Sequence, residues 1–271
     1  MLVKLTIHVT PFLTADFTGK FVKTLLIAAN PELEPVFEDK KSPTPKPIRI
    51  TPLIDQRGVP VYPKVIAEGD EVGRPRGPPM PIEVGGTYYI YIGYRQELGP
   101  QVDRVVSRLV GGVELDYGTR VRVALRGYEI VEHGVKGDFS SVKVHFVTPA
   151  VFVDPFRGKS KDRAKRFLPF PGVVFSVNVY ELFRERYMRG VLAVSHALVE
   201  SHSAIDTVRR VWYYYGGKWL PGVVGYVKYF LRPGLTREVR EAVREVLRDA
   251  AEMGVGSGRA AGFGFVRLSF S

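Results

Sequence analysis

The order of the predicted strands and helices constrains the fold most, because both halves of the 271-residue chain show the same order. Alternation of apolar and polar residues predicts strands, and apolar residues three or four positions apart predict helices. The first half predicts a strand at 2–8, a helix at 17–29 with Asp16 as its N-cap, short extended pieces within the Pro-rich tract 43–81, a strand at 87–94, a helix at 99–109 and a strand at 119–131.

The second half repeats this order. It predicts a strand at 141–149, a helix at 172–187, two strands at 205–215 and 219–231 joined by the turn Gly216-Gly217-Lys218, a helix at 235–253 and a strand at 262–270. Each half is therefore a β-α-β-β-α-β unit, the split motif of ferredoxin-like domains. We predict an α+β protein of two tandem ferredoxin-like (RRM-like) domains, at 1–135 and 139–271, with a glycine-rich loop near the C-terminus.

That loop is the run GVGSGRAAGFG, residues 254–264, which directly follows a charged amphipathic helix. One glycine after the last helical turn is expected as a cap, so Gly254 alone has a structural explanation. Five glycines exceed that need, since each costs about 0.5–1 kcal/mol where ordinary structure would do. Bare backbone lets N–H groups approach a phosphate closely, so we interpret the run as facing a ligand rather than as merely flexible. The candidate contacts in it are Gly256, Gly258, Arg259 and Gly262.

Charge and cysteine content narrow the classes of function. Lys and Arg (39) exceed Asp and Glu (28), and the net charge of +11 favours a polyanionic partner such as nucleic acid, although general basicity explains it as well. The absence of cysteine excludes disulfides and thiolate metal sites, and the five histidines lack metal-ligand spacing. We therefore expect no metal and no cofactor. Without a membrane span or a signal peptide in the sequence, we expect a cytoplasmic protein that binds no membrane.

Two regions are rich in cations that suit phosphate contacts. The stretch RGKSKDRAKR at 157–166 holds six cations and one Asp, although a solvated loop explains it equally well. In the predicted hairpin 205–231, cations share faces with aromatic residues, of which one or two could stack on bases. The candidate RNA contacts in and next to these regions are Arg157, Lys159, Lys161, Arg163, Lys165, Arg166, Lys218, Lys228 and Arg232.

Lys20 and Lys23 stand three residues apart on the first predicted helix, and therefore on one face of it. Two close ammonium groups are expected to lower each other's pKa. A lysine tuned towards neutral takes a proton from a ribose 2′-OH, while a charged neighbour stabilises the phosphorane and the departing 5′-oxygen. By spacing alone, solvent-facing helix lysines are the commoner explanation.

Several segments together resemble the CRISPR-associated repeat endoribonucleases of the RAMP superfamily. They are GVGSGRAAGFG, FTGKFVK on the first helix, FVTPAVF at 146–152 and PGVVGYVKY at 221–229. The resemblance covers essentially the whole chain. It implies a metal-independent endoribonuclease that cuts CRISPR repeat RNA in the precursor transcript into guide RNAs, leaving a 2′,3′-cyclic phosphate and a 5′-hydroxyl. It implies CRISPR repeat RNA as the partner, and leaves open a homodimer and the hand-over of guide RNA to an effector complex.

The catalytic residues of that family differ between its branches. Many members use a tyrosine, a histidine and a lysine in the N-terminal domain, whereas this chain has no histidine between His8 and His133. The chain is similar instead to a crenarchaeal branch that uses lysines, two on the first helix and one in the extended segment that follows. The resemblance implies that Lys20, Lys23 and Lys46 take these places as the catalytic set.

Two alternatives bear on this interpretation. The segment AGFGFVRL at 261–268 nearly matches the RNA-recognition-motif signature, but that signature needs a helix and a fourth strand after it, and only three residues follow Leu268. A non-catalytic RAMP scaffold subunit that coats guide RNA would share the glycine loop and the charge. It would not need Lys20, Lys23 and Lys46 to act together.

Overall fold

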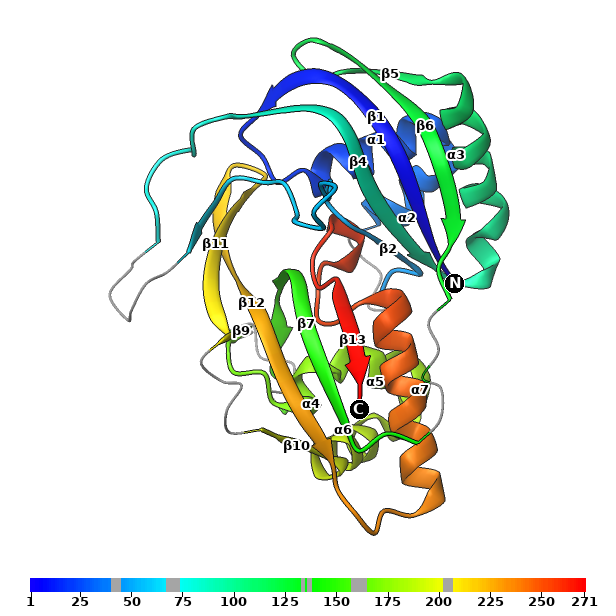
Figure 1. Ribbon diagram of the computed structural model, residues 1–271, viewed down its shortest axis with the longest axis vertical. Coiled ribbons are helices and arrows are strands. Elements are labelled where there is room, and N and C mark those ends of the chain that lie inside the picture. Colours follow the sequence, from blue (N-terminus) through cyan, green and yellow to red (C-terminus); the bar gives the residue numbers. More distant parts are fainter. Residues whose placement is uncertain (40–44, 67–73, 133–134, 136–137, 157–164, 202–206) are drawn as a thin grey trace. The chain divides into compact units, whose positions relative to one another are not determined.

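In the computed structural model the chain forms two compact units, each with its own sheet and hydrophobic core (Figure 1). The structure describes all residues except 40–44, 67–73, 133–134, 136–137, 157–164 and 202–206. The first unit comprises Met1–Glu132, Trp212–Leu220 and Arg259–Gly262, and the second comprises His133–Val211, Pro221–Gly258 and Phe263–Ser271. Two short segments from the second half of the sequence therefore belong to the first unit.

The first unit is built on an antiparallel sheet of order β2-β4-β1-β6-β5. Its elements are β1 (Leu2–Thr14), α1 (Gly19–Ala29), the 3-10 turn η1 (Pro31–Leu33), α2 (Glu34–Glu38), β2 (Ile48–Ile50), β3 (Lys64–Ile66), β4 (Ile82–Tyr94), η2 (Gln96–Leu98), α3 (Gly99–Gly111), β5 (Val113–Asp116) and β6 (Arg120–Ile130). With β1 between β4 and β6, and with α1 and α3 packed in the same core, this is the ferredoxin-like arrangement.

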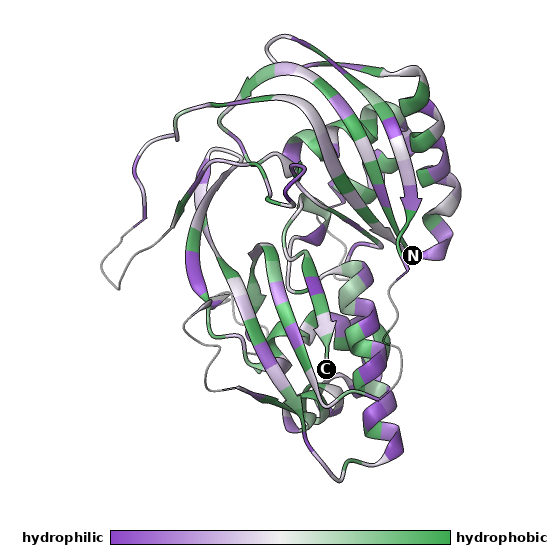
Figure 2. Cartoon of the chain, in the orientation of Figure 1, coloured by the Kyte–Doolittle hydropathy of each residue, from purple (hydrophilic) through white to green (hydrophobic). Residues whose placement is uncertain are grey.

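The burial pattern of β1 shows why these residues form this sheet. Val3, Leu5 and Ile7 are fully buried against the helices, while the residues between them are partly exposed on the open face. Figure 2 shows the resulting alternation of apolar and polar residues along the strands. The strand continues six residues beyond the predicted end at residue 8, through a register shift between Val9 and Phe12.

The second unit is built on the sheet of order β13-β7-β12-β11-β3, and β10 pairs with β12. Strand β3 and the tip of the β11–β12 hairpin belong to the first unit. Its remaining elements are β7 (Ser141–Ala150), β8 (Phe152–Val153), β9 (Lys165–Arg166), α4 (Pro171–Val174), α5 (Ser176–Phe183), η3 (Arg184–Arg186), α6 (Tyr187–Ala197), β10 (Leu198–Glu200), β11 (Arg209–Tyr215), β12 (Lys218–Leu231), α7 (Arg237–Met253), η5 (Arg259–Ala261) and β13 (Val266–Phe270).

The strand order β13-β7-β12-β11 is the same ferredoxin-like arrangement, with β7 between the last and the third strand. Apolar residues of α5, α6 and α7 pack in one core with those of β7 and β12. The predicted α+β architecture of two tandem ferredoxin-like domains is confirmed. Among the described residues, no helix is both long and apolar enough to cross a bilayer.

Two predicted elements differ in detail, and one predicted turn is confirmed. The helix predicted at 172–187 is a series of shorter helices that breaks at Phe175 and Arg184 and continues to Ala197. The closing strand begins at Val266 rather than at residue 262, because the glycines before it have positive φ angles. The turn predicted between the two strands of the hairpin is confirmed, since β11 ends at Tyr215 and β12 begins at Lys218.

Candidate active site

The first two turns of α1 carry two of the three predicted catalytic lysines, and the loop after β2 fixes where this helix begins. The hydroxyl of Thr18, the residue before the helix, donates to the carbonyl of Val61 at 2.5 Å. The same hydroxyl accepts the backbone N–H of Leu53 at 3.1 Å. The predicted N-cap, Asp16, is wrong, because the helix begins at Gly19 and the carboxylate of Asp16 bonds elsewhere.

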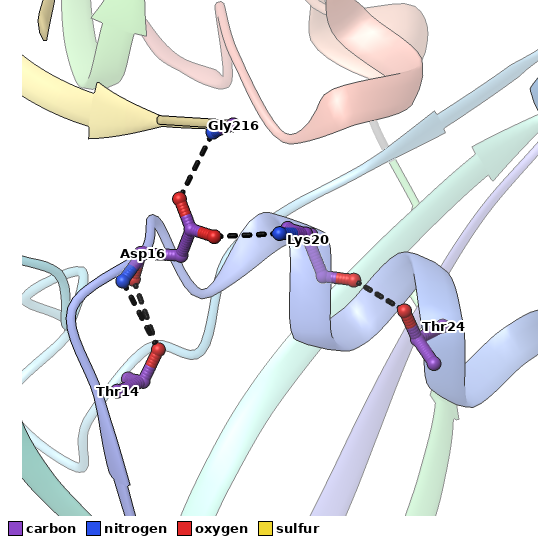
Figure 3. Close-up of polar contacts among 5 residues, drawn as sticks. All are labelled: Thr14, Asp16, Lys20, Thr24 and Gly216. Carbon is purple, nitrogen blue, oxygen red and sulfur yellow. Dashed lines mark hydrogen bonds and ion pairs between the residues drawn. The ribbon is translucent and has the colours of Figure 1, made fainter. Parts of the chain in front are cut away.

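Asp16 links α1 to the turn between β11 and β12 (Figure 3). Its Oδ2 atom lies 2.6 Å from Nζ of Lys20, one helical turn later, and its Oδ1 atom accepts the backbone N–H of Gly216 at 2.9 Å. The backbone N–H of Asp16 donates to Oγ1 of Thr14 at 3.1 Å. The side chain of Asp16 is 19% exposed and that of Lys20 is 45% exposed. The side chain of Lys20 is therefore partly open to solvent, while the carboxylate that it pairs with is more buried.

This ion pair changes the expected charge state of Lys20. The hydrogen bond that Lys20 donates to Asp16 raises the pKa of Lys20 above its ordinary value, while partial burial acts in the opposite direction and has the smaller effect. The expectation that a neighbouring ammonium tunes this lysine towards neutral is wrong for Lys20. Lys20 is held as a cation.

The other two predicted catalytic lysines meet at the end of α2. Nζ of Lys23, whose side chain is 18% exposed, lies 2.5 Å from Oε1 of Glu38. Lys46 donates to the backbone carbonyl of Phe37, the residue before that glutamate. Because Lys20 and Lys23 share one helix face and Lys46 contacts the residue next to the partner of Lys23, the structure brings the three lysines into one region.

Two tyrosines that were not predicted from the sequence belong to this region. Burial has the largest effect on the pKa of Tyr215 and raises it. The two α1 lysines lower this pKa, and their partners Asp16 and Glu38 raise it. The Tyr215 phenol therefore lies within electrostatic range of both ion pairs. Burial likewise raises the pKa of Tyr117, and Lys20 lowers it. These residues come from the end of β11 and from the β5–β6 turn, and no local sequence signal connects them to α1.

Part of the glycine run packs against the start of α1. Gly262 has a φ of +101°, and a Cβ there would stand 2.9 Å from the Phe17 ring and 3.2 Å from Cα of Gly19. A Cβ on Gly19 would overlap the carbonyl oxygen of Ala261. Glycine is therefore needed at both positions because two backbones meet there.

This packing gives the glycine run a structural role that its sequence did not show. Gly256 is also buried, and a Cβ there would stand 2.6 Å from the carbonyl oxygen of Val151. Arg259 lies in η5 with only 4% of its surface exposed, whereas Gly258 is exposed. The glycine run therefore has a packing role in the fold, and its contact with RNA stays a prediction.

The predicted RNA contacts elsewhere have varied surroundings. Arg157, Lys159, Lys161 and Arg163 lie outside the described residues. Lys165 and Arg166 form β9, and Nη2 of Arg166 lies 2.6 Å from Oδ2 of Asp154. Lys218 is exposed at the start of β12, Nζ of Lys228 lies 5.0 Å from the centroid of the Phe230 ring, and Nε of Arg232 donates to the carbonyl of His196 at 2.9 Å.

The open face of the second sheet also carries cations beside an aromatic ring. Nζ of Lys143 on β7 lies 3.6 Å from the centroid of the Tyr226 ring on β12. His145 is exposed and stands between Tyr226 and Arg267 in register. Desolvation, Arg267 and Lys143 lower the pKa of His145. This face therefore has the chemistry of a surface for unpaired nucleotides.

Two tandem ferredoxin-like domains, the second ending in a glycine-rich segment, define the chain as a RAMP protein. Its residues 4–131 match the family of Cas6 N-terminal domains, and residues 144–266 match the family of the CRISPR-associated endoribonuclease Cas6. The chain belongs to the Cas6 family, whose members process CRISPR repeat RNA, and the resemblance seen in the sequence is confirmed. No curated protein sequence matches the chain.

Solved structures show the same fold over nearly the whole chain. A Cas6 product complex is 16% identical with a TM-score of 0.64, and 99% of each chain is covered. Cas6 from Thermus thermophilus is 15% identical with a TM-score of 0.60, covering 99% of this chain and 97% of that one. A Cas6-related protein from Pyrococcus furiosus is 12% identical with a TM-score of 0.56, covering 99% and 98%. At such identities the likeness shows the fold.

Proposed function

We propose that this protein is an active, metal-independent endoribonuclease that cuts CRISPR repeat RNA and leaves a 2′,3′-cyclic phosphate and a 5′-hydroxyl. The observation that carries the proposal is the gathering of Lys20, Lys23 and Lys46 at the start of α1 and the end of α2. In the reaction, the ribose 2′-oxygen attacks the adjacent phosphorus and loses its proton to a base. The bond from phosphorus to the 5′-oxygen breaks, and that oxygen gains a proton.

The position of Lys20 in the helix supports a functional role over a solvent-facing one. A cation in the first turn faces the positive end of the helix dipole, which typically costs about 0.3–1 kcal/mol at an exposed site. The same end of a helix favours a phosphate group. The carboxylate of Asp16 offsets part of this cost, and a phosphate bound at the start of the helix would offset more of it.

We assign different roles to the three lysines. Because Asp16 keeps Lys20 protonated, Lys20 suits the cation that stabilises the charge on the phosphorane, or the acid that protonates the leaving oxygen. We assign the proton transfer from the 2′-OH to the pair Lys23 and Lys46. Both now bind protein groups, so RNA has to replace those contacts.

We further propose CRISPR repeat RNA as the partner, bound by the predicted cationic residues and by the open face of the second sheet. Two similar structures support this, since one is a Cas6 product complex and the other is a RAMP protein binding different RNA substrates. Dimerisation and the hand-over of guide RNA to an effector complex stay predictions.

A test of the reaction type uses the purified chain, a labelled cognate repeat RNA and excess EDTA. We expect cleavage to continue in EDTA and to yield a product with a cyclic phosphate. A single 2′-deoxy substitution at the cut nucleotide should abolish cleavage while leaving binding intact. Cleavage of the 2′-deoxy substrate would rule out attack by the 2′-oxygen, and tight binding without any cleavage would favour the non-catalytic scaffold subunit.

A further inference from the structure

The tip of the β11–β12 hairpin, residues 212–220, is held against the start of α1 by three consecutive contacts. The backbone N–H of Phe17 donates to the carbonyl of Tyr214 at 2.8 Å, and the Phe17 ring lies 5.6 Å from that of Tyr213. The backbone N–H of Gly216 donates to Asp16. A segment far along the sequence thus forms one wall of the region that holds the catalytic lysines.

We propose that Asp16 is a positioning residue for RNA cleavage, whose carboxylate holds the Lys20 ammonium and the hairpin tip together so that the tip forms part of the active site. The proposal rests on the proposed function of Lys20. An isolated exposed ion pair one helical turn apart contributes little. Here the same carboxylate also accepts a backbone N–H from the hairpin, so one side chain determines the positions of two elements (Figure 3).

The geometry of the tip suits this role. Gly216 and Gly217 have φ angles of +57° and +81°, which allow the two-residue turn and orient the N–H of the first towards Asp16. The backbone bonds at Tyr214 and Gly216 lie on either side of Tyr215, whose phenol is within electrostatic range of both ion pairs. Lys218, two residues further on, is exposed. The tip therefore adds a phenol to the lysine cluster and carries an exposed cation close to it in sequence.

Asp16, Tyr117 and Tyr215 all favour the protonated form of Lys20. Asp16 has the largest effect on the pKa of Lys20, and Tyr117 and Tyr215 raise that pKa further. Lys23 is paired with Glu38, so its charge is partly compensated. Removing the carboxylate charge of Asp16 should therefore shift the pKa of Lys20 to lower pH.

The test compares Asp16→Asn with Asp16→Glu. The asparagine keeps an oxygen for the N–H of Gly216 but loses the ion pair, whereas the glutamate keeps the charge. Single-turnover cleavage at saturating protein is measured from pH 7 to 10. We expect the asparagine variant to cleave about 10- to 100-fold more slowly, which is the effect of losing one charged hydrogen bond. As the pH is raised, its cleavage rate should begin to fall at a lower pH than that of the wild type. The glutamate variant should recover part of the rate.

Asp55→Asn is the matched control. Asp55 also accepts backbone N–H groups in the first unit, from Arg57 at 2.9 Å and Val59 at 2.8 Å, but it pairs with no lysine among the contacts described. Its substitution should leave the pH profile of cleavage unchanged. An Asp16→Asn enzyme with the wild-type rate and the wild-type pH profile would overturn the proposal.

A second measurement separates this inference from the proposed function. The pKa of Lys20 is followed by NMR on protein labelled in its lysine side chains, with Lys20→Arg to assign the signal. We expect this pKa to fall in Asp16→Asn whether or not the wild type cleaves RNA, and an unchanged pKa would overturn the inference. If the wild type cleaves no repeat RNA while this pKa falls, the proposed function fails and the Asp16–Lys20 pairing stands.

Discussion

Gly19 and Ala261 are in direct backbone contact, although one opens the first helix of the chain and the other belongs to the C-terminal glycine run. A Cβ at position 19 would overlap the carbonyl oxygen of Ala261, so the two segments approach this closely only because residue 19 is glycine. The run that appeared from its composition to be a ligand loop is also the support on which the helix with the predicted catalytic lysines is packed.

The first prediction concerns this contact. Gly19→Ala should destabilise the protein by about 1–3 kcal/mol, the usual cost of an added group without space, as measured by urea denaturation. The control is Gly111→Ala at the end of α3, where an added Cβ meets nothing within 4 Å. That substitution should be neutral or stabilising, because alanine favours helix more than glycine does. Equal stability of the two variants would contradict the contact.

The second prediction concerns stability at alkaline pH. The pKa of Lys20 is raised in the folded state, so its ion pair stabilises the fold below the unfolded lysine pKa of about 10.4. That contribution is lost as the pH rises through the folded pKa. Because Lys20 is substantially exposed, we expect a difference under about 1 kcal/mol between the wild type and Lys20→Gln at pH 8, shrinking above pH 10. A difference that grows with pH would contradict the assignment.

The third prediction concerns the contact of the hairpin tip with RNA. If Lys218 binds a phosphate, Lys218→Gln should weaken the salt dependence of repeat RNA binding. The slope of log binding constant against log salt concentration should become less negative by about 0.7–0.9. The control is Arg104→Gln, because Arg104 already pairs with Glu32 and is not a predicted contact. Filter binding at several salt concentrations measures both slopes. Equal changes in the two variants would show a general charge effect instead of a contact.

The architecture could be predicted from the sequence because it depends on local patterns. Alternation along β1 and helical spacing in α1, α3 and α7 reflect burial of one face, and each pattern is complete within its own segment. The helix predicted at 172–187 was too short, because the helical region continues to Ala197. Breaks at Phe175 and Arg184 interrupt the periodicity of its apolar residues.

The site could be predicted only in part, for the same physical reason. The spacing of Lys20 and Lys23 places both on one helix face, which is a local property. Glu38, the partner of Lys23, and the hairpin tip come from other segments, and the bond from Gly216 to Asp16 joins residues that no local pattern connects. The pKa of Lys20 was therefore predicted in the wrong direction, because its partner Asp16 had been interpreted as a helix cap.

We propose that three lysines on and beside α1 cut the RNA. The most direct test is the single-turnover rate of cognate repeat cleavage, in EDTA, by the triple variant Lys20→Ala, Lys23→Ala, Lys46→Ala at saturating protein. Lys4→Ala is the control, since Lys4 pairs with Glu129 at 3.2 Å on the open face of the first sheet. We expect a loss of at least about a thousandfold in the triple variant and a near wild-type rate in the control. A triple variant that cleaves at the wild-type rate would contradict this proposal.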